Sequence, residues 1–417
     1  MSAAGASTEA APAAAASAES VRAEVGNVPA IEGLRGLAVL WVMLFHYVVL
    51  RDGKFDDALI AFLGTWTPLD VLVRNGYLGV DLFFLITGFL LTLPWFRHAD
   101  EGLPAPDRRS FYARRARRIA PAYYVQLVLL FFVVLPLFYP RIWIQSTPFV
   151  VGNLGAHFTF LHYTTPLTSS SMTLNGALWT LAIEFQYYLL LPLVAPLFVR
   201  WPWRSLLAAA AISAGWRWLA WNDLEAVVNL YLALGAKAGV TQKEVRHLLA
   251  TQLPAYSLHF ALGILLGRAW MLRRGRAAEG TGRWVPVAIA AFALGGLYAV
   301  LRNGTAVLGQ MGWIAFPVVL ALAFGAVVSW PSPLLSRLAA AWPLASLGRI
   351  SYSAYLYHLP VLLLFNAFLP TVTGWLAPIL WGAIVVLVSA ASFRFVERRF
   401  LSRAVPQAPA ALASPAG

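Results

Sequence analysis

Long apolar segments separated by charged loops make up most of this chain. Ten segments have about the 20-residue length that a membrane-spanning helix requires, and they lie at about 34–50, 77–96, 119–138, 179–199, 205–222, 254–272, 284–301, 310–329, 350–369 and 375–395. An eleventh candidate, 148–164, is weaker because it carries one Asn and two His. The pattern predicts an all-α polytopic membrane protein.

The arginines between these segments decide between ten and eleven spans. Seven arginines and three acidic residues separate the second segment from the third, which places that loop in the cytoplasm by the positive-inside rule. With ten spans, the basic groups at 200–204, 268–283 and 398–403 fall on the same side. We therefore expect about ten transmembrane helices with both termini cytoplasmic, and an outer or re-entrant segment at 148–164.

The composition agrees with a membrane protein. Hydrophobic residues make up 60% of the 417 residues and charged residues 12%. The absence of Cys excludes disulfides and thiolate chemistry. A net charge of +13 fits basic cytoplasmic loops, and we expect no nucleic-acid partner. The Ala-rich tail 1–28 and the Ala/Pro-rich tail 404–417 are expected to be disordered, on either side of one transmembrane domain at 29–403.

The first apolar segment carries two ionisable residues on one face. Arg35 and His46 are eleven positions apart, so at about 100° per residue they lie within about 20° of each other and about 16 Å apart along the axis. Taken singly, Arg35 is equally explained as an interfacial anchor and His46 as a hydrogen-bonded core residue. Their shared face favours a polar path that ends at a base or nucleophile.

Two carboxylates are expected at a depth similar to that of His46. Asp81 lies about four residues inside the outer end of the second segment, and Glu184 about five residues inside the fourth. Together with His46 they would form an acid/base centre, in which a carboxylate holds the imidazole in one tautomer. The alternative for Asp81 is a structural partner for another buried polar group.

Two further stretches carry candidate site residues. Arg115 and Arg118 lie at the cytoplasmic end of the third segment, where guanidinium groups suit the phosphates of a donor; such clusters also serve topology and lipid head groups. Ser351, Tyr355 and His358 fall near one helix face by their i, i+4, i+7 spacing. The alternative for these three is a buried hydrogen-bonding stripe.

The remaining histidines and the longest outward loop carry weaker signals. Thr241 and Glu244 predict a capping box that opens a short helix, either a surface helix or a lid. Four further histidines lack ionisable residues at matching positions, and we expect them to be structural or exposed: His157, His162, His247 and His259.

Five of these stretches together resemble the acyltransferase-3 family of integral membrane acyltransferases. The matching elements, in the family's order, are Arg35 with His46, Gly79-Val80-Asp81 through Gly88-Phe89, Arg115 with Arg118, Trp179 to Glu184, and Tyr355 with His358. Thr87 and Thr180 stand where the family commonly has Ser, and both keep a hydroxyl group. The resemblance covers most of residues 30–400.

The resemblance implies ten membrane helices and transfer of an acyl group, often acetyl, from acyl-CoA to a hydroxyl. Acceptors are commonly sugars of cell-surface glycans, glycolipids or glycosylated small molecules. We expect an integral protein of the bacterial inner membrane, with no metal and no bound cofactor beyond this co-substrate. The residues specify no oligomeric state. The contrasting hypothesis is a transporter or flippase of an acylated or glycosylated lipid.

We expect the site residues to take the following roles. His46 would be the general base on the acceptor hydroxyl or a transient acyl carrier, with Asp81 or Glu184 orienting it or balancing its charge. Arg35, Arg115 and Arg118 would bind the donor. Residues expected in support are Glu32, Trp179, Ser351, Tyr355 and His358.

Overall fold

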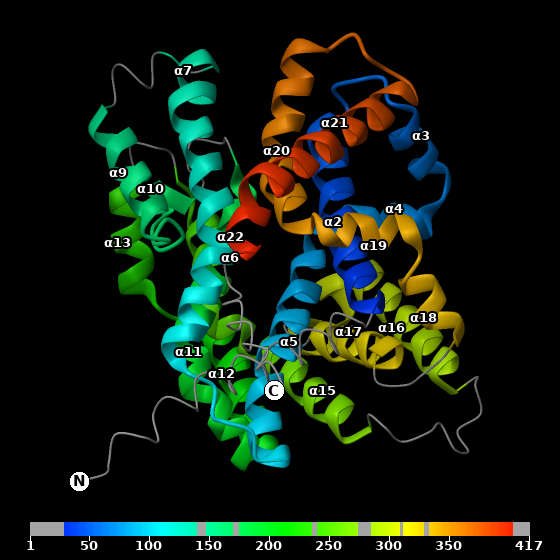
Figure 1. Cartoon of the computed structure of the whole chain (residues 1–417). Coiled ribbons are helices and arrows are strands. Elements are labelled where there is room, and N and C mark those ends of the chain that lie inside the picture. The colour runs from blue at the N-terminus through cyan, green and yellow to red at the C-terminus, as the bar shows by residue number, and fades with distance from the viewer. Residues whose placement is uncertain are drawn as a thin grey trace, which may run out of the picture.

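The computed structural model describes residues 29–138, 140, 147–169, 175–235, 240–273, 285–308, 312–328 and 333–402. The predicted tails, 1–28 and 404–417, lie outside these residues. Within the described part all regular structure is helical and there is no β-strand (Figure 1). The all-α prediction is therefore confirmed.

Helices occupy all ten of the predicted apolar segments. They are α2 (Pro29–Arg51), α5 (Gly79–Glu101), α6 (Arg108–Leu129), which continues through a π-helical turn (Leu130–Val134) into α7 (Leu135–Phe138), α11 (Trp179–Arg200), α12 (Pro202–Asn222), α15 (Ser257–Arg273), α16 (Val285–Leu308), α17 (Gly312–Val328), α20 (Ser351–Phe368) and α21 (Leu376–Ser392). After α21 the chain passes through a second π-helical turn (Phe393–Glu397) into α22 (Arg398–Ser402).

Seven helical stretches in the described residues are long and apolar enough to cross a bilayer. They are Ala30–Arg51, Gly76–Glu101, Arg108–Phe138, Gly176–Arg200, Leu253–Arg273, Val285–Arg302 and Leu376–Leu401. The other three predicted spans are the helices α12, α17 and α20. These stretches make the protein an integral membrane protein.

Shorter helices connect or cover the long ones. They are α3 (Ala58–Thr65), α4 (Thr67–Arg74), α9 (Thr147–Phe158), α10 (Pro166–Ser169), α13 (Glu225–Gly235), α14 (Gln242–Ala250), α18 (Pro333–Ala339) and α19 (Trp342–Arg349). The expected outer or re-entrant segment is α9, whose 12 residues reach only about 18 Å, too short for a hydrocarbon core of about 30 Å. The expected capping box is present at the start of α14, where Thr241 and Glu244 bond each other's backbone N–H groups.

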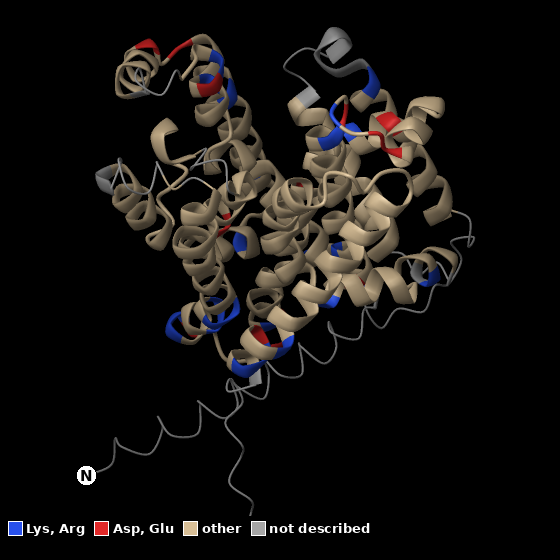
Figure 2. Ribbon diagram, turned by 90° about the horizontal axis from the view of Figure 1, so that it is seen from above, with Lys and Arg blue, Asp and Glu red and all other residues tan. Residues whose placement is uncertain are grey.

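Charged residues lie mainly at two opposite edges of the molecule. Figure 2 shows Lys, Arg, Asp and Glu gathered toward the upper and lower edges of the ribbon, with an almost uncharged belt between them. A few charged positions lie inside this belt. Because ionisable groups at membrane depth usually face a protein interior or a cavity, these inner positions locate the candidate site.

Close helix packing fixes the helices that carry the site. A Cβ added to Gly88 of α5 would lie 2.3 Å from the Phe260 carbonyl oxygen, and one added to Gly263 of α15 would lie 2.2 Å from the Leu85 carbonyl oxygen. Only glycine permits this approach, which is the small-residue packing of membrane helices. The helices α5 and α15 therefore act as one rigid pair.

A buried ion pair anchors the C-terminal end of α2. The Arg51 side chain is fully buried, and its Nε donates to Asp57 at 2.9 Å. Its two terminal nitrogens donate to Asn366 Oδ1 at 2.7 Å and to the Val372 carbonyl at 3.2 Å. These contacts join α2 to the end of α20, and so hold in register the two helices that carry His46 and His358.

Candidate active site

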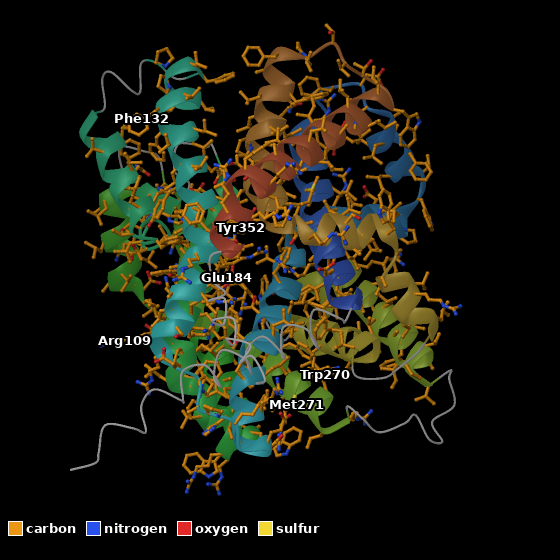
Figure 3. All side chains as sticks on the ribbon, viewed as in Figure 1. Arg109, Phe132, Glu184, Trp270, Met271 and Tyr352 are labelled. Carbon is orange, nitrogen blue, oxygen red and sulfur yellow. The ribbon has the colours of Figure 1, made fainter. Side chains whose placement is uncertain are left out.

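A polar cavity of about 130 Å³ lies among the long helices. Figure 3 shows two of its lining residues, Glu184 and Tyr352, in the middle of the bundle. Polar side chains on its wall come from five helices: Arg35 (α2), Thr87 (α5), Arg115 and Arg118 (α6), Thr180, Glu184 and Tyr188 (α11), and Ser351, Tyr352 and Tyr355 (α20). The structure thus brings all three predicted donor-binding arginines to one cavity, together with one predicted catalytic carboxylate. We call it the reaction cavity.

Glu184 is held on the wall of this cavity by two hydroxyl groups. Its Oε1 accepts a hydrogen bond from Tyr188, one helical turn further along α11, and another from Thr87 Oγ1 at 3.3 Å on α5. Thr87 is one of the two positions where the family commonly has Ser, and here its hydroxyl holds the carboxylate. Glu184 thus shares the cavity wall with the three guanidinium groups. Within the described residues it has no hydrogen bond or ion pair with His46.

The three arginines have different surroundings. Arg118 is held by Glu397, with 3.4 Å between its Nη1 and Oε2, and the guanidinium of Arg115 lies 6.0 Å from the centre of the Phe111 ring. Arg35, which is half-buried, makes no hydrogen bond or ion pair with a residue of the described ranges. Three guanidinium groups face two carboxylates, Glu184 on the cavity wall and Glu397 behind Arg118, so the excess of positive charge suits an anionic ligand.

His46 contacts His358 instead of a carboxylate. Its Nδ1 lies 3.1 Å from Nε2 of His358 and 3.0 Å from the Val42 carbonyl oxygen. The ring centres of the two histidines are 5.0 Å apart. The expectation that Asp81 or Glu184 orients His46 is corrected: in the structure a second imidazole, from α20, occupies that place.

The carbonyl contacts assign the tautomers of both rings when they are neutral. Nδ1 of His358 lies 2.8 Å from the Tyr355 carbonyl oxygen, which can only accept, so this nitrogen carries the proton and Nε2 is an acceptor. Nδ1 of His46 has two accepting neighbours, Val42 O and His358 Nε2, so it also carries its proton. Nε2 of His46 is then left with a lone pair, as a base or nucleophile requires.

Tyr355 connects the reaction cavity to the histidine pair. Its ring lies on the cavity wall, 5.7 Å from the ring centre of His358. Its hydroxyl donates to the Ala177 carbonyl at 2.8 Å and accepts from Thr180 Oγ1 at 2.7 Å. Ser351, one turn before it, is fully buried, and its Oγ has no hydrogen-bond partner in the described ranges. The stripe Ser351–Tyr355–His358 is thus formed as the spacing predicts.

Pro360, two residues after His358, explains why two buried side-chain amides donate to the backbone of α20. The sequence did not single out these amides. Pro360 has no N–H, so the carbonyl of Leu356, four residues earlier in α20, lacks its helical donor. Asn175 Nδ2 donates to this carbonyl at 2.9 Å, and Gln126 Nε2 donates to it as well. These amides tie α20 to α6 and to the start of α11 beside the histidine pair. The Pro inside an apolar segment was the sequence signal.

Asp81 is paired with His259 on another face of α5. Its carboxylate lies 2.5 Å from His259 Nε2, and both side chains are buried. The three ionisable residues expected at one depth do not meet in the described part of the chain. Glu184 lines the reaction cavity, Asp81 faces α15, and His46 contacts His358. His259, expected to be structural or exposed, is the buried partner that a carboxylate at this depth requires.

Other expected supporting residues lie away from the cavity. Trp179 packs against Tyr163 and Tyr256, with ring centres 5.2 and 5.8 Å away. Glu32 lies near Arg349 on the surface, at 3.5 Å. Both are packing or surface contacts, and neither lines the reaction cavity.

Glu397 was missed by the sequence reasoning although it is fully buried. It lies in the π-helical turn after α21, accepts from Ser353, and faces Arg118. In the sequence Glu397 directly precedes Arg398 and Arg399, so it resembles one of the charged residues that commonly end a membrane helix. In the described part of the chain no group of three His, Asp or Glu side chains could hold a metal ion.

Comparison of the chain with known proteins finds a family of enzymes. Residues 28–394 match the model of the Acyl_transf_3 acyltransferase domain. The peptidoglycan O-acetyltransferase OatA of Listeria monocytogenes is 27% identical over 397 residues, which cover 89% of this chain and 55% of the relative. Nodulation protein 10 of Rhizobium leguminosarum is 26% identical over 314 residues, 72% of this chain and 74% of the relative.

A relative outside the bacteria also matches. The regulator of hypoxia-inducible factor 1 of Caenorhabditis elegans is 24% identical over 397 residues, 86% of this chain and 75% of the relative. The chain spans about half the length of the peptidoglycan O-acetyltransferases that it matches. No solved structure matches it.

Proposed function

Because this chain belongs to the Acyl_transf_3 family of acyltransferases, we propose that it is a membrane O-acyltransferase. It moves an acyl group, expected to be acetyl, from acyl-CoA to a hydroxyl of a sugar-containing acceptor. Relatives named peptidoglycan O-acetyltransferases support a glycan acceptor and the acetyl group. Its apolar helices and bacterial relatives support a place in the bacterial plasma membrane.

One observation supports this proposal most strongly: Tyr355, on the wall of a cavity lined by three guanidinium groups, lies beside the histidine pair. Three guanidinium groups line the cavity, and they suit the phosphates of a CoA donor. Along α2, Arg35 and His46 are about 16 Å apart. We propose that a long donor binds with its phosphates near Arg35 and its thioester near the histidine pair, past Tyr355.

We propose that Nε2 of His46 performs the transfer in one of two ways. As a base it takes the proton of the acceptor hydroxyl, whose oxygen attacks the thioester carbonyl. The C–S bond then breaks, and the departing thiolate receives the proton. As a carrier, Nε2 attacks the thioester carbonyl, the C–S bond breaks, and the departing thiolate takes the proton that the ring releases from Nδ1. The acceptor hydroxyl then attacks the acyl group, the bond between Nε2 and the acyl carbon breaks, and the hydroxyl proton returns to the imidazole. In both, Nε2 of His358 accepts a hydrogen bond from Nδ1–H of His46 and so orients the ring.

The remaining expected roles divide between the cavity and the helix packing. Glu184 is proposed to balance the guanidinium charge and to take part in proton movement in the reaction cavity, where it lies. Asp81 is proposed to act through its pair with His259 by fixing α5 against α15, and not by contact with His46. With ten spans and cytoplasmic termini, the arginine side of the cavity would receive the donor from the cytoplasm.

Reconstituted protein tests the proposal directly. Purified full-length protein in vesicles is supplied with labelled acetyl-CoA and a peptidoglycan fragment, and the acceptor is examined by mass spectrometry for an ester. Formation of the ester, and its loss in His46→Ala at equal protein level, are expected. A transporter or flippase would instead move a lipid across the vesicle without forming any ester, and that result would overturn the proposal.

The two roles of His46 are separable in the same preparation. Without acceptor, a carrier becomes labelled by labelled acetyl-CoA at His46, whereas a base does not. Peptide mapping after rapid quenching measures this label.

A further inference from the structure

A second cavity lies beside the reaction cavity, between α6 and α11. Its volume is about 230 Å³. It shares Arg115, Ile119 and Tyr188 with the reaction cavity, so the two are adjacent and have a common wall. We call it the lateral cavity. Its other walls are apolar or aromatic, and the residues that matter below are Tyr112, Ala116, Tyr124, Phe160, Phe185 and Leu189.

An aromatic stack forms one wall of the lateral cavity. The ring of Phe160 stacks on Tyr123 and on Phe185, with ring centres 4.5 and 4.6 Å apart. The backbone of Phe160 has a φ of 58°, a conformation that a bulky residue rarely adopts. The stack and the hydrogen bond from Tyr124 to the Phe158 carbonyl, at 2.9 Å, hold this turn in place. The cavity wall is therefore a fixed feature of the fold.

The helices around the lateral cavity present an apolar outer surface. Leu189 is 47% exposed, and Leu190 and Leu193 beside it on α11 are exposed as well. On α6 the exposed residues include Val125 and Val128. In a membrane-spanning helix such residues face the hydrocarbon chains of the bilayer. The lateral cavity is thus placed where a lipid chain can reach it.

The charge at the inner wall indicates which lipid fits. Arg115 is the cationic residue that lines the lateral cavity, and Arg114, Arg117 and Arg118 are its neighbours on α6. Tyr112, in the first turns of the same helix, donates to the Leu189 carbonyl at 3.0 Å, and tyrosine is typical of the membrane interface. A hydrocarbon chain against the aromatic wall would therefore carry its head group toward a cluster of guanidinium groups.

We propose that the lateral cavity binds one chain of an anionic phospholipid of the bilayer, with the lipid phosphate against Arg115. The shape of the site accounts for both parts of this ligand: the aromatic and aliphatic walls take the chain, and the guanidinium takes the phosphate. The site opens toward the bilayer and ends at the wall of the reaction cavity. Lipid binding requires neither donor nor acceptor, and it shares Arg115 with the proposed donor site.

Photolabelling in bilayers tests the site without any acyl donor. Full-length protein is placed in nanodiscs that contain a trace of phosphatidylglycerol with a diazirine on one chain, or phosphatidylcholine with the same chain. Labelled peptides are then identified by mass spectrometry. Peptides covering 112–124 and 185–189 are expected to be labelled about fivefold more by phosphatidylglycerol, the preference that about 1 kcal/mol from one arginine gives.

A matched pair of substitutions on α11 separates this site from the general lipid surface. Leu189→Trp fills the lateral cavity and is expected to remove the fivefold preference. Leu193→Trp makes the same change one turn further on the exposed face, outside the cavity, and is expected to keep it. Ala116→Phe fills the cavity from α6 and repeats the test should Leu189→Trp fail to fold. Equal labelling by the two lipids, or a preference unchanged in the filled variants, would overturn the proposal.

Discussion

Nε2 of His358 lies 3.1 Å from Nδ1 of His46, across 312 positions of the sequence. This contact joins α2 to α20 and leaves Nε2 of His46 as the nitrogen with the free lone pair. A neutral histidine that accepts a hydrogen bond from Nδ1–H orients the ring as a carboxylate would, but without adding a charge at membrane depth.

Replacing His358 should slow acyl transfer without weakening donor binding. His358→Ala removes one of the two acceptors for the Nδ1–H of His46 and leaves the Val42 carbonyl. The ring then loses the contact that orients it from α20, and we expect kcat to fall by about 10²-fold. His358→Gln should retain more activity, because its amide oxygen can accept the same proton. Steady-state kinetics with varied acyl-CoA measure kcat and the KM for acyl-CoA.

The control for this comparison is His247→Ala, which changes an exposed histidine on α14 and should leave kcat unchanged. A His358→Ala variant with the wild-type kcat, or one whose KM alone rises, would contradict the orienting role.

Glu184→Gln should lower kcat while leaving the fold intact. The amide oxygen can still accept from Tyr188 and Thr87, so the geometry is kept and only the negative charge is lost. We expect kcat to fall by about 10²-fold and KM for acyl-CoA to stay equal or decrease, because the cavity becomes more positive. Tyr188→Phe removes one hydrogen bond and keeps the charge, so its effect should be smaller. Equal kcat values for Glu184→Gln and wild type would argue against a part in proton movement.

Removing Arg115 should weaken the use of acyl-CoA. A hydrogen bond to a charged group contributes about 1.5–3 kcal/mol, so Arg115→Ala is expected to raise KM for acyl-CoA by about tenfold or more, and increasing salt should reduce the difference. The matched control is Arg109→Ala on the first turn of the same helix, where the side chain is exposed at the periphery (Figure 3). An unchanged dependence on acyl-CoA in Arg115→Ala would count against donor binding by this residue.

Asp81→Ala should destabilise the protein. The substitution leaves His259 buried without its partner, and an unsatisfied buried polar group costs about 1–3 kcal/mol. Thermal unfolding in detergent should show a lower midpoint, and the double variant Asp81→Ala/His259→Ala should lose less than the sum of the two single changes. A large loss of kcat in Asp81→Asn at wild-type stability would instead support the catalytic role expected from the sequence.

The sequence predicted the helices and most of the site residues for physical reasons that are local. Apolar length alone identifies the helices, because the hydrocarbon core sets the length of a span. Arg35, Arg115, Arg118 and Glu184 stand out because an ionisable residue in an apolar segment needs a polar environment. Helical periodicity likewise predicts that Ser351, Tyr355 and His358 share a face.

The partners of these residues were decided only by the tertiary structure. Depth along the membrane normal placed His46, Asp81 and Glu184 at one level, but two side chains meet only when their helices also face each other. The rotation of α5 directs Asp81 to His259 and Thr87 to Glu184, and the packing of α20 against α2 brings His358 to His46. Sequence periodicity gives the face of one helix; which neighbour it meets depends on how all the helices pack.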